Sequence, residues 1–331
     1  MKFDLFIEKV REYVEGYCMD NGSISKEGED NNNSAVIINV VEKNNGVKLH
    51  GLSIKEKTQN ISATVYLEEY YEEYQKNGDF EGICRDIVSK LNQNNLHRCV
   101  NVDFLKEFEK IKNRVFPKVI NYEKNKEGLL NMPYRKVHDL AVIYYVSCDN
   151  IIDGGVIVIK NDLFSRWQIS EDKLYEIAIN NIELLEPKMI SIEKMILNIE
   201  LGRGIGKDWI DIRSDVDDEN MEKIKSYFRN DTSHMFVVSN AARRFGSSLI
   251  LSGKLMKFFA DCLGKSFYIL PSSVHELIIL AVADSADCYE IMNLKEIVKS
   301  VNQTSVDEID FLSDEVYLYN FQRDEITICK N

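Results

Sequence analysis

Short apolar runs separated by tight turns constrain the fold of this chain most. Residues 35–41 and 47–54 are rich in β-branched side chains, and between them lies Asn44-Asn45-Gly46, whose glycine can adopt positive φ. This pattern predicts an antiparallel hairpin. Similar runs predict further strands at residues 61–67, 137–148, 154–160, 235–238, 247–251, 267–270, 274–283, 316–319 and 326–328.

Amphipathic segments lie between these groups of strands. Residues 3–17 place apolar side chains three and four positions apart, the spacing of one helix face. Ser170, followed by Glu171 and Asp172, is typical of a helix N-cap, and Ser191 precedes a helix with Ile192, Met195, Ile196 and Ile199 on its apolar face. Strand groups joined by tight turns, with helices between them, predict the α+β class: antiparallel sheets with helices packed against them. Other predicted helices cover residues 68–74, 80–91, 102–115, 221–229, 254–263 and 287–302.

The 331 residues are enough for two domains. We place the boundary after residue 132, which gives an N-terminal α+β half, residues 1–132, and a C-terminal α+β half, residues 133–331. Residues 20–34 are polar and without periodicity, and we expect a loop there. Residues 202–220 are rich in glycine and then in acids, and we expect an irregular segment.

The net charge of the chain argues against two classes of binding partner, nucleic acids and anionic membranes. The chain has 41 Lys and Arg against 54 Asp and Glu, a net charge of −13. Binding to nucleic acid or to an anionic membrane needs a cationic face, so we expect neither as a partner. The longest apolar runs, such as residues 140–146, are far shorter than the roughly 20 residues of a membrane-spanning helix. Charges interrupt residues 1–10, unlike a signal peptide, and we expect a cytoplasmic protein.

Motifs for metals, disulfides and cofactors fail in their spacing. Seven cysteines without a C-x-x-C pair predict buried thiols in a reducing compartment. Residues 202–207 have three residues, not four, between the first glycine and Gly206-Lys207, and Asp208 follows where a phosphate loop needs Ser or Thr. Residues 211–222 lack the glycine of a calcium loop, since Val216 stands there. We therefore predict no cofactor and no metal site.

Residues 271–276 combine groups that perform nucleophilic catalysis. Ser272 and Ser273 supply hydroxyls, His275 an imidazole and Glu276 a carboxylate. A hydroxyl within hydrogen-bond reach of the imidazole would make a nucleophile, with Arg243 as an assisting group in a hydrolase-like enzyme. Two structural interpretations compete with this one. Ser273 and Glu276 fit a capping box if a helix begins here, whereas Pro-Ser-Ser is a turn if strands flank it.

Two further groups are candidates for binding. Asn240, Arg243 and Arg244 lie between two predicted strands, where the guanidiniums would suit a carboxylate or phosphate; an exposed hairpin tip is the alternative. Tyr70 and Tyr71 belong to a segment rich in tyrosine and glutamate that would suit a protein partner. Burial of these rings would remove that surface.

Six segments together carry a family resemblance: residues 44–54, 66–71, 120–125, 139–145, 268–276 and 312–317. In their order and spacing they resemble the domain of unknown function 5688 family of gut-dwelling Clostridia, over residues 36–320. The resemblance implies an intracellular bacterial protein with one compact architecture across both halves, and it supplies no catalytic residue. Residues 20–34 and 202–232 depart from the family pattern.

Three functions stay open at this stage. The first is a non-enzymatic module that binds or regulates a protein partner. The second is the hydrolase-like enzyme built on the turn at residues 271–276. The third is an acidic protein that mimics nucleic acid and inhibits a partner, although its acids are spread along the chain. The sequence does not decide whether the chain is an enzyme, nor its oligomeric state.

Overall fold

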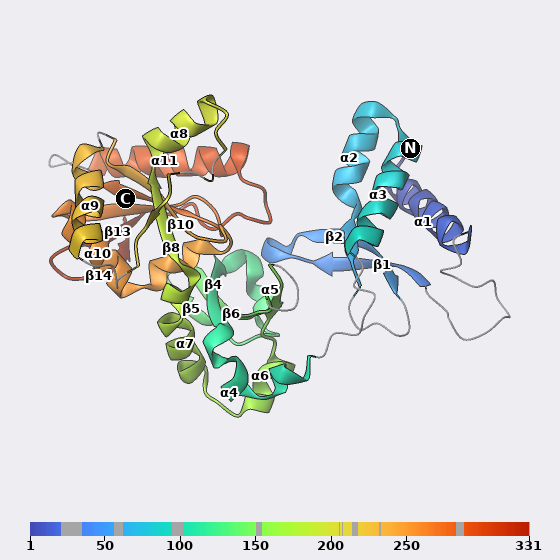
Figure 1. Ribbon diagram of the computed structural model, residues 1–331, viewed down its shortest axis with the longest axis horizontal. Coiled ribbons are helices and arrows are strands. Elements are labelled where there is room, and N and C mark those ends of the chain that lie inside the picture. Colours follow the sequence, from blue (N-terminus) through green and yellow to red (C-terminus); the bar gives the residue numbers. More distant parts are fainter. Residues whose placement is uncertain are drawn as a thin grey trace. The chain divides into compact units, whose positions relative to one another are not determined.

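The computed structural model divides into two compact units, Met1–Val102 and Asp103–Asn331. Both contain antiparallel sheets with helices packed against them, which confirms the predicted α+β class (Figure 1). The structure describes residues 1–20, 35–55, 62–94, 102–149, 154–204, 206, 208–213, 218–231, 233–282 and 288–330.

The first unit is a three-stranded antiparallel sheet with three helices. Its strands follow the order β1 (Ala35–Glu42), β2 (Lys48–Lys55) and β3 (Thr64–Tyr66), and the predicted hairpin is confirmed. Asn45 and Gly46 take positive φ in the turn, which is the conformation that closes a hairpin tightly. Apolar side chains of the sheet and of all three helices form one core. The helices are α1 (Phe3–Asp20), α2 (Leu67–Asn77) and α3 (Phe80–Asn94).

The second unit contains two antiparallel sheets. The larger has seven strands in the order β14-β13-β11-β12-β10-β8-β9, and in the smaller β6 pairs with β4, β5 and β7. The larger sheet comprises β8 (Pro187–Ser191), β9 (Ile210–Asp211), β10 (Met235–Asn240), β11 (Phe267–Pro271), β12 (Leu277–Ala281), β13 (Tyr317–Asn320) and β14 (Glu325–Ile328). The smaller comprises β4 (Val115–Asn121), β5 (Arg135–Val137), β6 (Leu140–Ser147) and β7 (Val156–Val158).

Helices cover both faces of the seven-stranded sheet. Successive side chains of a strand point to opposite faces. Accordingly, Tyr268 packs in a cluster with Val298 of α11, whereas its neighbour Phe267 contacts Phe259 of α10, with 6.1 Å between the ring centroids. The helices of this unit are α4 (Phe108–Ile111), α5 (Lys126–Leu129), α6 (Asn161–Trp167), α7 (Glu171–Asn180), α8 (Ile192–Glu200), α9 (Asp218–Asn230), α10 (Gly253–Leu263) and α11 (Cys288–Ser305).

The first unit ends at Val102, thirty residues before the boundary that we expected from the sequence. Strand β4 pairs with β6 along its whole length, from Val115 opposite Val146 to Asn121 opposite Leu140. Residues 103–132 therefore belong to the second unit. Hydrogen bonding between distant strands fixes this division, and the local sequence pattern contains no sign of it.

Two segments adopt a different secondary structure from the predicted one. Residues 246–251 form a 3₁₀ helix instead of a strand, because Ser247 Oγ donates to Val274 O at 2.6 Å and Ser248 Oγ donates to Phe245 O at 2.8 Å. Residues 102–115 form only short turns and α4, not one helix. The predicted N-caps are correct, since Ser170 and Ser191 accept from the amides of Lys173 and Lys194.

The described cysteines are free thiols. Cys18, Cys84, Cys148 and Cys329 are buried and Cys262 is half-buried, while Cys99 and the side chain of Cys288 lie outside what the structure describes. Burial raises the pKa of the Cys84 thiol to about 12, with Glu81 adding to the shift, so this thiol is protonated at neutral pH. Among the helices that the structure describes, none has the length and hydropathy to cross a membrane.

Candidate functional site

The segment at residues 271–276 is a turn between strands. Strand β11 ends at Pro271 and β12 begins at Leu277, and Ser273 N donates to Glu276 O at 3.3 Å. No helix begins here, so the capping-box interpretation is wrong and the turn interpretation is confirmed. The predicted strand at residues 274–283 correspondingly begins three residues later.

The imidazole of His275 is already engaged at both nitrogens. Nδ1 accepts a hydrogen bond from the Phe245 amide at 3.3 Å, and Nε2 lies 3.2 Å from Asp310 Oδ1. A neutral imidazole has one acceptor nitrogen, and here the Phe245 amide uses it. Ser273 Oγ accepts from the His275 backbone amide at 3.0 Å, and Ser272 Oγ donates to Glu276 Oε1 at 3.5 Å. This geometry pairs neither hydroxyl with the imidazole, so it does not favour the hydrolase-like hypothesis.

The loop after β10 is braced against this turn. Asn240 is buried, and its side chain donates to Arg244 O at 2.7 Å and accepts from Arg244 N at 3.1 Å. Ser239 Oγ donates to His275 O at 2.8 Å. Gly246 passes so close that a Cβ on it would lie 2.5 Å from that same oxygen. The loop is therefore held in one conformation from both ends.

The two neighbouring arginines point to different surroundings. Arg243 is exposed and lies over the Trp209 ring, 5.2 Å from its centroid. Arg244 is half-buried and its Nη1 donates to Gly154 O. The two guanidiniums therefore do not converge on one anion, and Arg244 lines a cavity that Arg243 does not line.

That cavity, which we call the β10 cavity, has a volume of about 250 Å³. It lies where the end of β10 and the loop at residues 241–245 meet strands β4, β6 and β7 of the smaller sheet. Aromatic rings form one wall, with 5.7 Å between the centroids of Phe116 and Tyr145 and 5.4 Å between those of Tyr145 and Phe245. Asn240 and Arg244 line it, so two of the predicted binding residues share one cavity.

The tyrosines that we considered for a protein surface are part of the first unit's interior. Tyr70 is 7% exposed, and its hydroxyl donates to Asp86 Oδ2 at 2.9 Å. Tyr71 packs on Phe3 with 4.9 Å between ring centroids, and its hydroxyl donates to Met1 O at 2.9 Å. These rings join α2 to α1 and α3, so we do not assign a binding surface to them.

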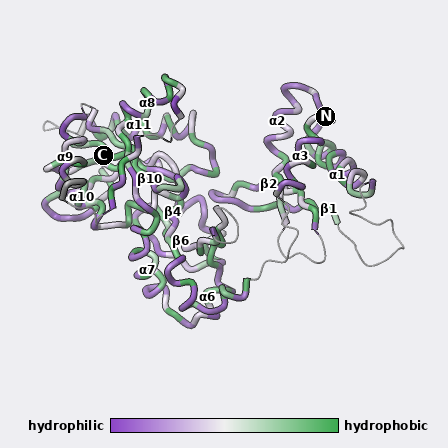
Figure 2. Tube along the Cα trace, in the orientation of Figure 1, coloured by the Kyte–Doolittle hydropathy of each residue, from purple (hydrophilic) through white to green (hydrophobic). Residues whose placement is uncertain are grey.

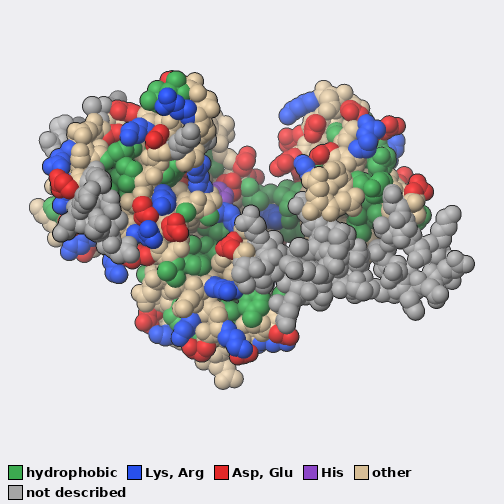
Figure 3. Space-filling view, in the orientation of Figure 1, with side chains coloured by type: hydrophobic (Ala, Val, Ile, Leu, Met, Phe, Trp, Pro, Cys, Tyr) green, Lys and Arg blue, Asp and Glu red, His purple; other side chains and the backbone are tan. Residues whose placement is uncertain are grey.

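Helix α8 exposes part of the apolar face that the sequence predicts: Ile196 and Ile199 are exposed, whereas Ile192 and Met195 are half-buried. Asn198 is only 2% exposed, and its side chain donates to Asp208 Oδ2 at 3.2 Å. The aliphatic side chains around it are in solvent. Figure 2 shows hydrophobic positions along α8, and Figure 3 shows hydrophobic side chains at the surface where α8 lies. We call this set the α8 surface: Ile196 is 50% exposed, Leu197 48%, Ile199 55% and Leu201 52%.

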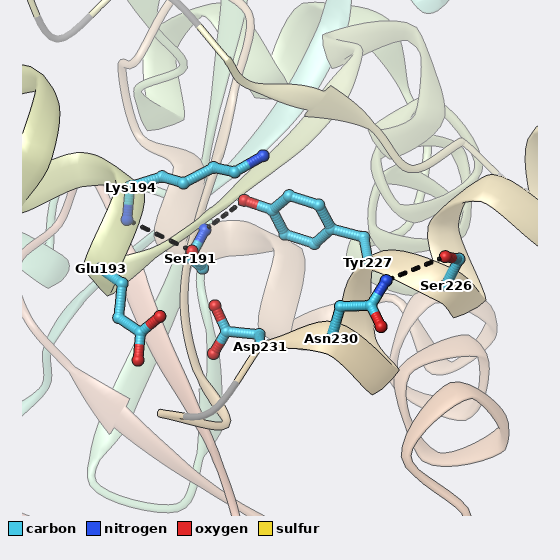
Figure 4. Close-up of a pocket in the computed structure, with 7 residues that line it drawn as sticks. All are labelled: Ser191, Glu193, Lys194, Ser226, Tyr227, Asn230 and Asp231. Atoms are coloured by element: carbon cyan, nitrogen blue, oxygen red, sulfur yellow. Dashed lines mark hydrogen bonds between the residues drawn. The ribbon is translucent and has the colours of Figure 1, made fainter.

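A polar cavity adjoins the beginning of α8. This α8–α9 cavity has a volume of about 310 Å³ and lies between the start of α8 and the end of α9 (Figure 4). Tyr227 Oη accepts from the Ser191 amide at 2.9 Å, and the Lys194 ammonium lies over the Tyr227 ring at 4.5 Å. The lining residues are Ser191, Glu193, Lys194, Ser226, Tyr227, Asn230 and Asp231.

Two carboxylates give this cavity its chemical character. Figure 4 shows Asp231, at the end of α9, directed toward Ser191 and Glu193 on the opposite side. Asp231 is 8% exposed, and its Oδ1 accepts from Ser233 Oγ at 2.6 Å and from the His234 amide at 3.0 Å. The Lys194 ammonium also lines the cavity, so two carboxylates are balanced by one positive charge, and the excess carboxylate, with an amide and hydroxyls, suits an ammonium or guanidinium group.

Metal binding has no comparable support in the described part of the chain. There, no group of three or more His, Cys, Asp or Glu side chains is placed to hold a metal ion. The acids at residues 214–217 lie outside the described residues.

Comparisons with known proteins place the chain in a family without assigning an activity. No curated protein and no solved structure matches it. One family model does match, and it spans residues 3–321 of the 331. The chain therefore belongs to that family, the family of unknown function DUF5688.

Proposed function

We propose that this chain is a non-enzymatic protein-binding module and that its partner docks on the α8 surface. One observation carries the proposal: α8 buries an asparagine, and three aliphatic side chains of α8 and Leu201 directly after it are about half exposed. Each of these side chains forgoes about half of the roughly 1.5–3 kcal/mol that full burial of such a side chain contributes. Clustered exposed aliphatic side chains of this kind mark interaction sites in soluble proteins.

The α8–α9 cavity supports a partner of basic character. Glu193 and Asp231 line it together with Lys194, so its carboxylates outnumber its ammonium, and a Lys or Arg beside a docked apolar segment would enter there. The net charge of −13 favours the approach of a cationic partner. The proposed partner is therefore a protein segment with an apolar helix face and a basic side chain at its edge.

A second copy of the chain is a less suitable partner. Four half-exposed aliphatic side chains offer a few hundred Å², whereas a stable interface buries about 800 Å² per partner. Two copies with a charge of −13 each also repel one another. Size and charge together favour a transient complex with a different, basic protein.

Leu197→Asp tests this docking surface. The probe is a short fluorescent helical peptide with leucines on one face and lysines at its edge, and fluorescence anisotropy measures its affinity for the full chain. We expect Leu197→Asp to weaken binding about 10-fold or more, since it places a charge in the contact. Leu130→Asp is the matched control, because Leu130 is 77% exposed away from α8.

The same assay tests the preference of the surface for a basic partner by comparing peptides of opposite charge. A peptide with glutamates in place of the lysines should bind less tightly, and Glu193→Gln should reduce the difference between the two peptides. Equal affinity of the wild type, Leu197→Asp and Leu130→Asp for the lysine peptide would overturn the proposal.

A further inference from the structure

The β10 cavity is lined by a tyrosine hydroxyl that is open to it. The Tyr145 side chain is 5% exposed and lines the cavity, and among the described residues nothing hydrogen-bonds to its hydroxyl, whose oxygen is accessible rather than enclosed by protein. A hydroxyl at the end of a ring held in place by packing loses little freedom when it donates to a ligand. Burial raises the pKa of Tyr145, which keeps the hydroxyl protonated and able to donate. A ligand acceptor in the cavity would satisfy it.

Arg244 supplies a positive charge beside this hydroxyl. One guanidinium nitrogen, Nη1, donates to Gly154 O, and within the described residues no carboxylate oxygen lies within 4.0 Å of the guanidinium. The Asn240 side chain fixes the Arg244 backbone through two hydrogen bonds. A guanidinium held in place loses little freedom on binding, and its donors match a carboxylate.

The rest of the lining describes the remainder of the ligand. Asp149 and Glu186 are exposed carboxylates at the same cavity and suit an ammonium group. Phe116, Val156 and Leu185 supply an apolar wall. The volume of about 250 Å³ is just below the roughly 300–1,000 Å³ of typical ligand pockets, so the ligand is small.

We propose that the β10 cavity binds a free α-amino acid with an apolar side chain. Its carboxylate pairs with Arg244 and accepts from the Tyr145 hydroxyl, its ammonium lies toward Asp149 and Glu186, and its side chain packs on the apolar wall. This site uses none of the residues of the α8 surface, so its test does not depend on the proposed docking function.

Isothermal titration calorimetry of the full chain with three related probes tests this site. The probes are L-leucine, isocaproate, which lacks the ammonium, and isoamylamine, which lacks the carboxylate. We expect leucine to bind most tightly, isocaproate about 10-fold more weakly, and isoamylamine without measurable heat. Tyr145→Phe and Arg244→Gln should each weaken leucine binding about 10-fold or more.

The controls separate a lost contact from a lost fold. Arg243→Gln removes the neighbouring guanidinium outside the cavity and should leave leucine affinity unchanged. Tyr145→Phe removes a hydroxyl without an internal partner among the described residues, so its melting temperature should equal that of the wild type. The proposal is overturned if leucine does not bind the wild type, if isocaproate binds as tightly as leucine, or if Tyr145→Phe and Arg244→Gln both bind leucine as the wild type does.

Discussion

Glu276 is a residue whose ionisation opposes folding. Burial raises the pKa of its carboxyl above the usual value, although the Ser272 hydroxyl and the nearby His275 and Arg243 act in the opposite direction. The folded chain therefore binds this proton more tightly than the unfolded chain. The stability that this group contributes is complete below its unfolded pKa and is lost as the pH rises through the folded pKa.

Glu276→Gln should remove this pH dependence. Because glutamine keeps an acceptor for Ser272 without a buried charge, we expect the variant to equal the wild type at pH 4 and to become more stable than the wild type as the pH rises toward 7. Urea unfolding at a series of pH values measures the difference. The account is contradicted if the difference in unfolding free energy between variant and wild type does not change with pH. It is also contradicted if the wild type becomes more stable relative to the variant as the pH rises.

The residues of this turn show what a sequence can indicate about a site. The neighbours of His275 along the chain suggested a hydroxyl–imidazole pair. The groups that occupy the imidazole are the Phe245 amide, 30 positions earlier, and Asp310, 35 positions later. Local sequence shows which groups are present, but the folded chain decides which of them each nitrogen contacts.

At the scale of elements, buried hydrogen bonds join segments that carry the family resemblance. The side chain of Asp139, next to β6, accepts from Ser313 Oγ at 2.6 Å and from Tyr317 Oη at 2.5 Å. Asn121 at the end of β4 donates to Leu312 O at 3.0 Å. These contacts link the smaller sheet to β13 of the larger sheet. We therefore assign the shared segments here a structural role.

Asp139→Asn should weaken this link. The amide retains one acceptor oxygen for two hydroxyl donors, one of them on the fully buried Tyr317, so we expect the free energy of unfolding to fall by about 1–3 kcal/mol. Urea denaturation measures the change. Asp307→Asn at an exposed position is the control and should alter stability by less than about 0.5 kcal/mol. Equal midpoints for the two variants would exclude the structural role.

Elements with local signals were the predictable ones. The hairpin of β1 and β2 follows from Asn45-Gly46, and the starts of α7 and α8 follow from their serine caps. The 3₁₀ helix at residues 246–251 was not predictable, because Ser247 bonds to a strand-connecting turn distant in sequence. The exposed face of α8 was also missed, since periodicity finds an apolar stripe but not what covers it.

The whole molecule combines two units with separate cores. The division at residue 102 depends on the pairing of β4 with β6, which joins residues from Asn121 opposite Leu140 to Val115 opposite Val146. Both proposed sites lie in the second unit. The α8 surface offers apolar contact beside two carboxylates, and the β10 cavity offers a guanidinium and a hydroxyl, so they suit ligands of different kinds.

Hydroxyl-radical footprinting of the full chain, read by mass spectrometry, tests the docking proposal most directly. In the free protein we expect strong oxidation of Leu197 and Ile199, which are exposed, compared with the buried Leu255. Addition of the lysine-edged peptide should reduce oxidation of the α8 surface several-fold and leave Leu130 unchanged. Weak oxidation of Leu197 and Ile199 in the free protein, or no protection at saturating peptide, would contradict the account.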